Sequence, residues 1–253
     1  MAVTRIAFEE DTVRTDPNRI TIQRPAGTQN GDLLVCFPAI RNAFASIVFH
    51  SSWTDLTGRV ESNTISGYLL VQIVDDDTPG EFLFTTTAGN AAFTAFIGTY
   101  RGVDQDDPIV ESILDDQTRV STELPIDSVD SVPDGMFVGI VGSSLSLLPI
   151  TAPPGMDLLY AQAAGQSPLS TAVADADTDG TPTGVRIFSC ASSSGQNSLG
   201  GAISLRPGGG PAATPLKIWD GAEFVSGTPK IWDGAEWVPG VPRIWDGSQW
   251  VPS

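Results

Sequence analysis

The sequence predicts an all-β fold: a jelly-roll-like antiparallel β-sandwich with internal duplication, followed by a short array of β-hairpin repeats. Three observations support this prediction. Gly and Pro interrupt the chain every eight to twelve residues and leave short runs rich in Val, Ile, Phe and Thr, as in proteins built from many short strands. Two long stretches of residues 1–207 match each other in order, and the last 37 residues carry one motif three times.

The sandwich domain, residues 1–207, is predicted to contain two pseudo-repeats of about 1–104 and 105–207. Four pairs of segments agree in order at offsets of 103 to 105 residues: Asp32–Val35 with Gly135–Val138, Trp53–Leu56 with Met156–Leu159, Phe82–Phe84 with Val185–Ile187, and Tyr100–Gly102 with Leu205–Pro207. Four matches in the same order are hard to obtain by chance. We therefore expect both halves to fold alike.

Each half is expected to contain the same series of strands. The series is a first strand, an apolar strand, a strand of alternating polarity and two closing strands. In the first half, the first three of these are Arg19–Gln23, Leu33–Ile40 and Gly67–Val74. In the second half they are Glu123–Asp127, Met136–Val141 and Ser167–Ala174. Apolar strands should be central, and alternating strands should have one face in water. We expect two antiparallel sheets packed face to face around one core shared by both halves. Two small sandwiches in tandem are the alternative.

Residues 208–216 form a predicted Gly/Pro linker, and residues 217–253 form three 13-residue repeats around Ile-Trp-Asp-Gly. Each repeat is predicted to be a β-hairpin, because Asp-Gly between aromatic runs is a strong turn signal. Two registers are open. A four-residue loop would place the two aromatics of each repeat opposite each other, whereas a two-residue Asp-Gly turn would place them on a diagonal. The opposite pairs would be Trp219 with Phe224, Trp232 with Trp237, and Trp245 with Trp250.

These six aromatic side chains are predicted to form an interface. An isolated hairpin is marginal in water, so its apolar side chains need cover from neighbouring repeats, from a partner or from other copies of the chain. We expect contacts with a partner or with other copies in a homo-oligomer. A solvated tail that orders on binding and a glycan-stacking surface are the alternatives.

The composition argues against several classes of partner. The net charge is −17, whereas nucleic-acid backbones and anionic membranes both require a basic face, so we expect no nucleic-acid binding. No run approaches the roughly 20 apolar residues of a membrane span, and no apolar segment follows Met1–Arg5. We therefore expect synthesis in the cytoplasm without a signal peptide and no membrane insertion. Cys36 and Cys190 lie in strand-like runs and are expected to be buried free thiols.

The sequence contains no recognisable catalytic motif. His50 is the single histidine, so a serine nucleophile would have no second histidine to act as its base. We therefore predict that the protein is not an enzyme. Asp175, Asp177 and Asp179 alternate before a glycine, as oxygen ligands do in a calcium loop. Position twelve of this segment is Arg186 rather than glutamate, so it is not an EF-hand. A calcium-binding loop and a solvated hairpin turn are both open interpretations.

The order of several short segments resembles a β-sandwich module of tail-associated and minor structural proteins of tailed bacteriophages. These segments are Gly31–Val35, Ser52–Leu56, Phe82–Thr86, Ile97–Asp104, Pro153–Asp157 and Ala202–Pro207. The C-terminal Trp-Asp-Gly-x-x-Trp-Val motif is similar to short repeats that end many minor tail proteins. Together the resemblances cover nearly the whole chain, and they imply no catalytic residues.

The resemblance implies a non-enzymatic virion component at the tail tip or in a tail fibre. Its implied partners are other virion proteins and, through a part in host attachment, host surface glycans. By analogy with fibres we expect a trimer. The alternatives are a head decoration or fibre protein of the capsid, and a carbohydrate-binding β-sandwich module in which exposed aromatics stack on glycans.

Overall fold

The structure is a computed structural model of the chain. It describes residues 1–13, 18–42, 44–62, 64–86, 92–119, 122–145, 147, 149–163, 169–191 and 196–208, and the backbone of six short strands between residues 217 and 252. The chain divides into two compact units, Met1–Gly208 and Gly209–Ser253, which we call unit 1 and unit 2. Every regular element of the described residues is a β-strand, and the strands among them pair antiparallel, which confirms the predicted all-β class.

The first half of unit 1 forms one large and one small sheet. The large sheet has the order β1-β10-β3-β7-β6, with β8 paired to β3 and β5 paired to β8; the small sheet has the order β2-β9-β4. The strands are β1 (Thr4–Val13), β2 (Arg19–Gln23), β3 (Leu33–Ile40), β4 (Ile47–Val48), β5 (Thr54–Asp55), β6 (Val60–Ser62), β7 (Ile65–Gly67), β8 (Leu70–Ile73), β9 (Glu81–Thr86) and β10 (Phe93–Arg101).

The second half repeats this arrangement. Its large sheet has the order β11-β18-β13-β16-β15, and its small sheet has the order β12-β17-β14. The strands are β11 (Ile109–Arg119), β12 (Glu123–Ile126), β13 (Pro133–Ser143), β14 (Ile150–Thr151), β15 (Asp157–Ala163), β16 (Ser170–Asp179), β17 (Arg186–Cys190) and β18 (Gln196–Leu205).

The pairings within each half are nested, as in a jelly roll. The first strand pairs with the last, the second with the one before it, and the third with the next inward, so β1-β10, β2-β9 and β3-β8 correspond to β11-β18, β12-β17 and β13-β16. A long hairpin that folds over on itself produces this order and distributes its strands between two sheets. The predicted internal duplication is therefore present in the topology. The predicted strand series lacked β1 and β11, whose mixed polar sequences carry no clear alternation.

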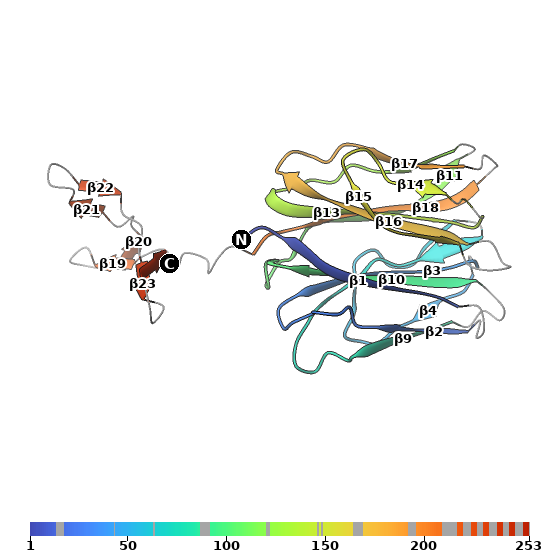
Figure 1. Cartoon of the computed structure of the whole chain (residues 1–253), viewed down its shortest axis with the longest axis horizontal. Helices are drawn as coiled ribbons and strands as arrows, with labels where there is room; N and C mark the ends of the chain where they lie inside the picture. The colour runs from blue at the N-terminus through green and yellow to red at the C-terminus, as the bar shows by residue number, and fades with distance from the viewer. Residues whose placement is uncertain are drawn as a thin grey trace. The chain divides into compact units, whose positions relative to one another are not determined.

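The four sheets of unit 1 stack as four layers, small-large-large-small (Figure 1). Three clusters of buried side chains fill the spaces between them. The prediction of two sheets around one shared core is therefore wrong. Each half forms its own sandwich, as in the alternative, and the two large sheets also bury a common central core. The physical reason lies in the apolar strand β3, which is buried on both faces: Val35 and Phe37 face the central core, and Leu34 faces the core of its own sandwich.

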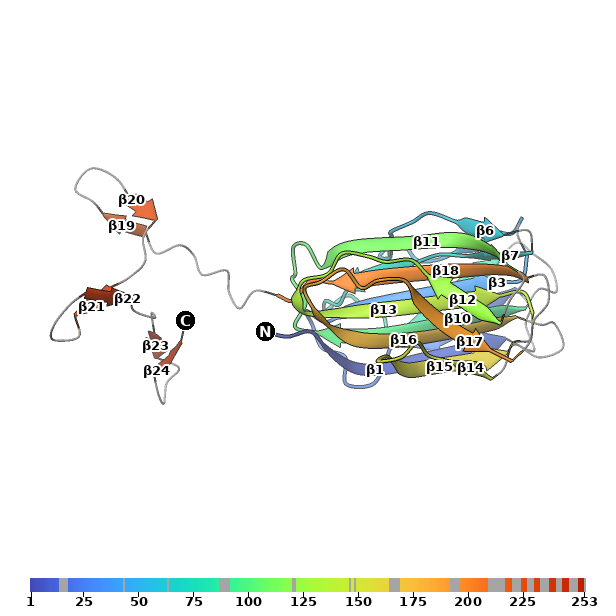
Figure 2. The same cartoon turned by 90° about the horizontal axis from the view of Figure 1, so that it is seen from above.

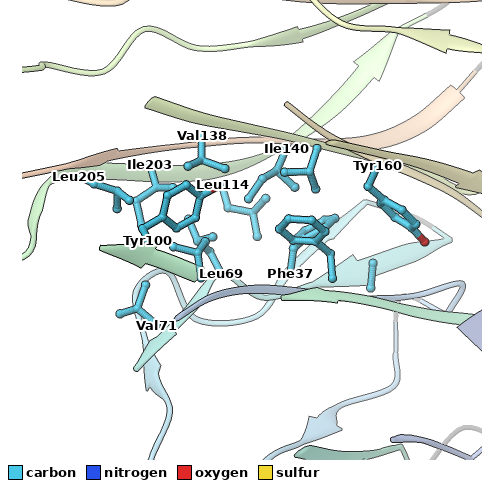
Figure 3. Packing of buried hydrophobic residues seen from close by; sticks show 14 of the residues in the cluster. Phe37, Leu69, Val71, Tyr100, Leu114, Val138, Ile140, Tyr160, Ile203 and Leu205 are labelled. Carbon is cyan, nitrogen blue, oxygen red and sulfur yellow. The ribbon is translucent and has the colours of Figure 1, made fainter. Parts of the chain in front are cut away.

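The central core joins the two halves. Figure 3 shows Phe37, Leu69, Val71 and Tyr100 of the first half packed against Val138, Ile140, Ile203 and Leu205 of the second. The halves are related by an approximate two-fold axis along the strands, because β1 lies beside β15 on one side and β11 beside β6 on the other (Figure 2). At one end of the stack, Val103 and Pro207 form an isolated antiparallel bridge between the halves.

One of the four sequence matches has the wrong register. The predicted match aligns Phe82–Phe84 with Val185–Ile187, but strand pairing makes Phe84 equivalent to Phe188, since Ile20 pairs with Phe84 and Leu124 with Phe188. Side chains alternate between the two faces of a strand, so a shift of one residue reverses the face. Phe84 and Phe188 are buried, whereas Val185 is 61% exposed.

The strands predicted to have one face in water are instead covered on both faces. Of residues 67–74, Gly67 ends β7 and 70–73 form β8, and both strands are almost wholly buried; residues 170–175 of β16 are all buried, and 167 and 168 lie outside the described residues. Their polar side chains form hydrogen bonds inside the stack. Gln72 donates to the hydroxyl of Thr78 at 3.3 Å, and Thr171 donates to that of Thr94 at 3.3 Å. Polar residues at core positions therefore gave a false signal of a wet face.

Unit 2 contains three two-stranded hairpins: β19 (Lys217–Trp219) with β20 (Phe224–Ser226), β21 (Lys230–Trp232) with β22 (Trp237–Pro239), and β23 (Arg243–Trp245) with β24 (Trp250–Pro252). Of the two open registers, the backbone adopts the one in which the two aromatics of each repeat are Cα partners, namely Trp219 with Phe224, Trp232 with Trp237 and Trp245 with Trp250. The turns, including 220–223, and the linker residues 209–216 lie outside the described residues.

Candidate functional site

A pocket of about 390 Å³ opens on the side of unit 1 where β1 lies beside β15. Residues of both halves line it, so it exists only because the two sandwiches are stacked. The lining residues are Val3, Thr4, Arg5, Met136, Gly155, Asp157, Asp175, Ala176 and Asp177.

A buried carboxylate forms the floor of the pocket. The side chain of Asp175 is 3% exposed and pairs with the guanidinium of Arg5, Nη1 to Oδ1, at 2.5 Å. Its other oxygen, Oδ2, accepts a hydrogen bond from the hydroxyl of Tyr100 at 3.3 Å. Asp157 lies at the rim with a side chain that is 81% exposed, 3.7 Å from Nη2 of Arg5. Arg5 and Tyr100 belong to the first half, and Asp157 and Asp175 to the second.

Burial controls the protonation of the Asp175 carboxyl group. Loss of hydration raises the pKa of Asp175 to about 6, although the adjacent Arg5 and the Tyr100 hydroxyl both favour the charged carboxylate. Burial, and then the neighbouring Asp175, raise the pKa of Tyr100 well above its usual value. The Tyr100 phenol therefore remains protonated and keeps donating to Asp175.

The approximate two-fold axis supplies an internal comparison for the pocket. Corresponding residues are found by following cross-strand Cα partners from strand to strand across each large sheet, which gives one row of residues for each sheet. In the first sheet one such row is Arg5, Tyr100, Leu33 and Ile73; the corresponding row of the second sheet is, in the same order, Ile109, Leu205, Met136 and Asp177. The neighbouring row reads Val35, Val71 and Thr54 in the first sheet and Val138, Asp175 and Asp157 in the second.

This comparison shows that the fold does not require polar residues at the pocket. The positions equivalent to Arg5, Tyr100, Asp175 and Asp177 hold Ile109, Leu205, Val71 and Ile73 on the opposite side, and all four of these apolar residues belong to or pack against the central core. The same backbone therefore supports an apolar seam on one side and a charged pocket on the other. A buried ion pair has no general advantage in stability over packed apolar residues, so the divergence points to a role other than folding.

Aromatic rings continue along the same seam. The ring of Phe8 on β1 stacks on Phe96 with centroids 5.9 Å apart, and Phe96 lies 6.0 Å from Tyr160 of β15. Phe96 and Tyr160 are buried, but Phe8 is 39% exposed. An aromatic ring partly open to solvent therefore follows the pocket along β1.

The predicted calcium ligands are not brought together. Asp175, Asp177 and Asp179 lie along strand β16 rather than in a loop. Alternate residues of a strand are about 6.6 Å apart, whereas calcium requires oxygens at about 2.3–2.6 Å from one point. Asp175 is engaged by Arg5, and Asp179 accepts hydrogen bonds from the backbone and hydroxyl of Thr181. Across the described residues, no group of three or more His, Cys, Asp or Glu side chains is arranged to hold a metal ion.

The other predicted residues lie elsewhere. Strand backbones place the six repeat aromatics in unit 2, but their side chains are outside the described residues. His50 is exposed and forms a hydrogen bond with Ser52 at 2.9 Å. Cys36 and Cys190 are buried free thiols, as predicted.

Sequence reasoning missed Arg5, Tyr100 and Asp157 as site residues. They come from strands far apart in the chain, and no local motif joins them. The internal repeat offered one available signal, a difference between the halves: at the matched positions, Leu205 stands in place of Tyr100, and Thr54 stands in place of Asp157.

Comparison with known proteins gives no relative: no family model, no curated protein and no solved structure matches this chain. Among the described residues, no helix is long and apolar enough to cross a membrane.

Proposed function

We propose that the protein is a non-enzymatic structural component of a tailed-virus particle, located at the tail tip or in a tail fibre. The observation that carries the proposal is the combination, on one chain, of a tandem jelly-roll unit with three repeated aromatic hairpins. The order of the sandwich segments and the Trp-Asp-Gly-x-x-Trp-Val repeats, which resemble those of minor tail proteins, support it.

The two units differ in their need for a partner. Unit 1 has three buried clusters and satisfies its own core. Each hairpin of unit 2 has strands of only three residues, and such a hairpin is marginal in water without further burial. Unit 2 therefore serves as the attachment element, contacting other virion proteins or other copies of the chain in a homo-oligomer, while unit 1 is displayed.

Both ends of unit 1 suit this arrangement. The amino group of Met1 donates a hydrogen bond to the carbonyl of Gly208 at 3.2 Å, so the chain enters and leaves unit 1 at the same end. The opposite end is left without a covalent connection. A display domain attached at one end and free at the other can contact an external surface.

Immunoelectron microscopy of intact virus particles with antibodies against unit 1 tests the location. Label at the tail tip or along tail fibres is the expected result. Label on the faces of the capsid would assign the protein to head decoration instead, and particles that contain none of it would refute the virion role. Antibodies against a known capsid and a known tail protein of the same particle provide the matched controls.

A carbohydrate-binding module is the second candidate function. The pocket favours it, because carboxylates, a guanidinium and a partly exposed aromatic ring lie along one seam of unit 1. This role is compatible with a position on the tail, where it would contribute to host attachment.

A further inference from the structure

We propose that the seam between β1 and β15 is a saccharide-binding site, selective for neutral or amine-bearing sugars, in which Arg5, Asp157 and Asp177 bind hydroxyl or amino groups and Phe8 stacks against a sugar ring. The inference rests on the host-attachment part of the proposed function. It gives that role a site and a ligand class.

The hydrogen-bonding capacity of the pocket suits a hydroxyl-rich ligand. Each sugar hydroxyl offers one donor and two acceptor lone pairs. The side chain of Asp177 is exposed, and that of Asp157 is 81% exposed and lies 3.7 Å from the Arg5 guanidinium; both residues line the pocket and offer carboxylate oxygens as acceptors. The guanidinium of Arg5 supplies donors beside them. Asp175 and Tyr100 hold that guanidinium in place from below, and we regard them as positioning residues.

The charge of the pocket selects the class of saccharide. One guanidinium stands against the carboxylates of Asp157, Asp175 and Asp177. The pocket therefore retains an excess of negative charge even when Asp175 is protonated. An acidic sugar would meet like charges at short range, whereas a neutral sugar would not and an amino sugar would be attracted.

Phe8 extends the site along the strand. It follows Arg5 by three residues on β1, but a bulge between Arg5 and Ala7 brings their partners on β10, Tyr100 and Gly98, within two residues of each other, or roughly 7 Å along the strand. The pairing of Arg5 with Tyr100 and of Phe8 with Gly98 places both on the face toward the central core. Because Phe96 supports one face of the Phe8 ring, the ring is held in position as a stacking surface. A saccharide of two or more rings can therefore engage the pocket and Phe8 together.

The internal duplication argues that these residues are present for binding. On the opposite side of the two-fold axis, Ile109 and Val71 occupy the positions of Arg5 and Asp175, and Ser112 lies where Phe8 would be, since Ser112 pairs with Ile203 as Phe8 pairs with Gly98. The apolar side shows that the fold forms without these polar and aromatic side chains. The side that carries them has, in addition, the hydrogen-bonding groups and the aromatic ring that bind a sugar.

Binding of the purified full-length protein to an array of neutral, amine-bearing and acidic oligosaccharides tests the class, and titration calorimetry with the strongest binder tests the site. Asp157→Asn and Asp177→Asn should each weaken binding about tenfold or more, since each replaces a charged acceptor by a neutral amide and so weakens a charge-assisted hydrogen bond. Asp106→Asn is the matched control, because Asp106 is also exposed but lies outside the pocket; it should leave affinity unchanged.

Three results would overturn the proposal: no saccharide bound, acidic saccharides alone bound, or binding that neither pocket variant weakens. Circular dichroism of each variant confirms that the fold is retained. Failure here would not affect the location of the protein on the particle, which immunoelectron microscopy measures separately.

Discussion

Replacing the buried ion pair of the pocket by the residues of its internal counterpart should leave unit 1 folded and at least as stable. The change is the triple substitution Arg5→Ile, Tyr100→Phe and Asp175→Val: it copies Ile109 and Val71, and it removes the buried Tyr100 hydroxyl, which would otherwise lose Asp175 as its acceptor. Replacing a buried pair by packed apolar groups is often neutral or stabilising by about 1–4 kcal/mol. The counterpart positions already hold these apolar residues in the same backbone register, so we expect a result within that range.

The two single substitutions should behave differently from each other. Arg5→Ile leaves Asp175, whose side chain is 3% exposed, without its cation, and breaking a buried pair in this way costs about 3–5 kcal/mol. Asp175→Val leaves an Arg5 that is 31% exposed and still has Asp157 at 3.7 Å, so we expect a smaller loss of about 1–3 kcal/mol.

Equilibrium urea unfolding of the full chain, followed by far-ultraviolet circular dichroism, measures all three variants. The expected order of stability is the triple variant at or above the parent, then Asp175→Val, then Arg5→Ile. If the triple variant loses as much stability as Arg5→Ile, the two seams are not interchangeable. The argument that the charged residues serve binding rather than folding would then fail.

Four further outcomes are expected. Burial raises the pKa of Asp175 in the folded state to about 6, so protonated Asp175 stabilises the fold. This stabilisation is complete below the pKa of an aspartate in the unfolded chain and is lost as pH rises through 6. Urea unfolding from about pH 4 to 8 should therefore show a falling free energy of unfolding, and Asp175→Asn should abolish this pH dependence. Trp53→Ala should destabilise the first sandwich by about 3–5 kcal/mol, since this buried ring packs 5.0 Å from Phe82, and a thermal melt as stable as the parent would contradict the packing. Gly200→Ala should also destabilise unit 1, because a Cβ there would lie 2.5 Å from the carbonyl oxygen of Pro125, and an unchanged urea midpoint would show that the sheets do not approach so closely. Changing Trp232, Trp237, Trp245 and Trp250 to Ala should leave unit 1 folded but cost roughly 2 kcal/mol or more of association energy for each anchoring ring; light scattering should show the loss, and monomers for both the parent and a 1–208 truncation would refute self-association.

The sequence by itself determined the class of fold and its repetition. Short alternating runs and short apolar runs between turn residues both predict strands, so the alternating Arg19–Gln23 and the apolar Leu33–Ile40 were predicted with the bounds of β2 and β3. Two matched halves are expected to form similar structures, and three closely similar Asp-Gly repeats are expected to form three similar hairpins. These are local properties, because backbone geometry and side-chain alternation act over a few residues.

Only the tertiary structure decided how the sheets are layered and where the candidate site lies. Apolar strands signal cover on both faces but do not identify what covers them, so the four-layer stack could not be distinguished from a single sandwich. The alternation of Asp175, Asp177 and Asp179 was compatible with a metal loop until strand pairing extended β16 through Asp179 and placed Arg5 on Asp175. That contact joins residues 170 positions apart, and its partners are set by the stacking of two sandwiches. Long-range packing therefore determines the pocket, because no local interaction encodes which distant strands will meet.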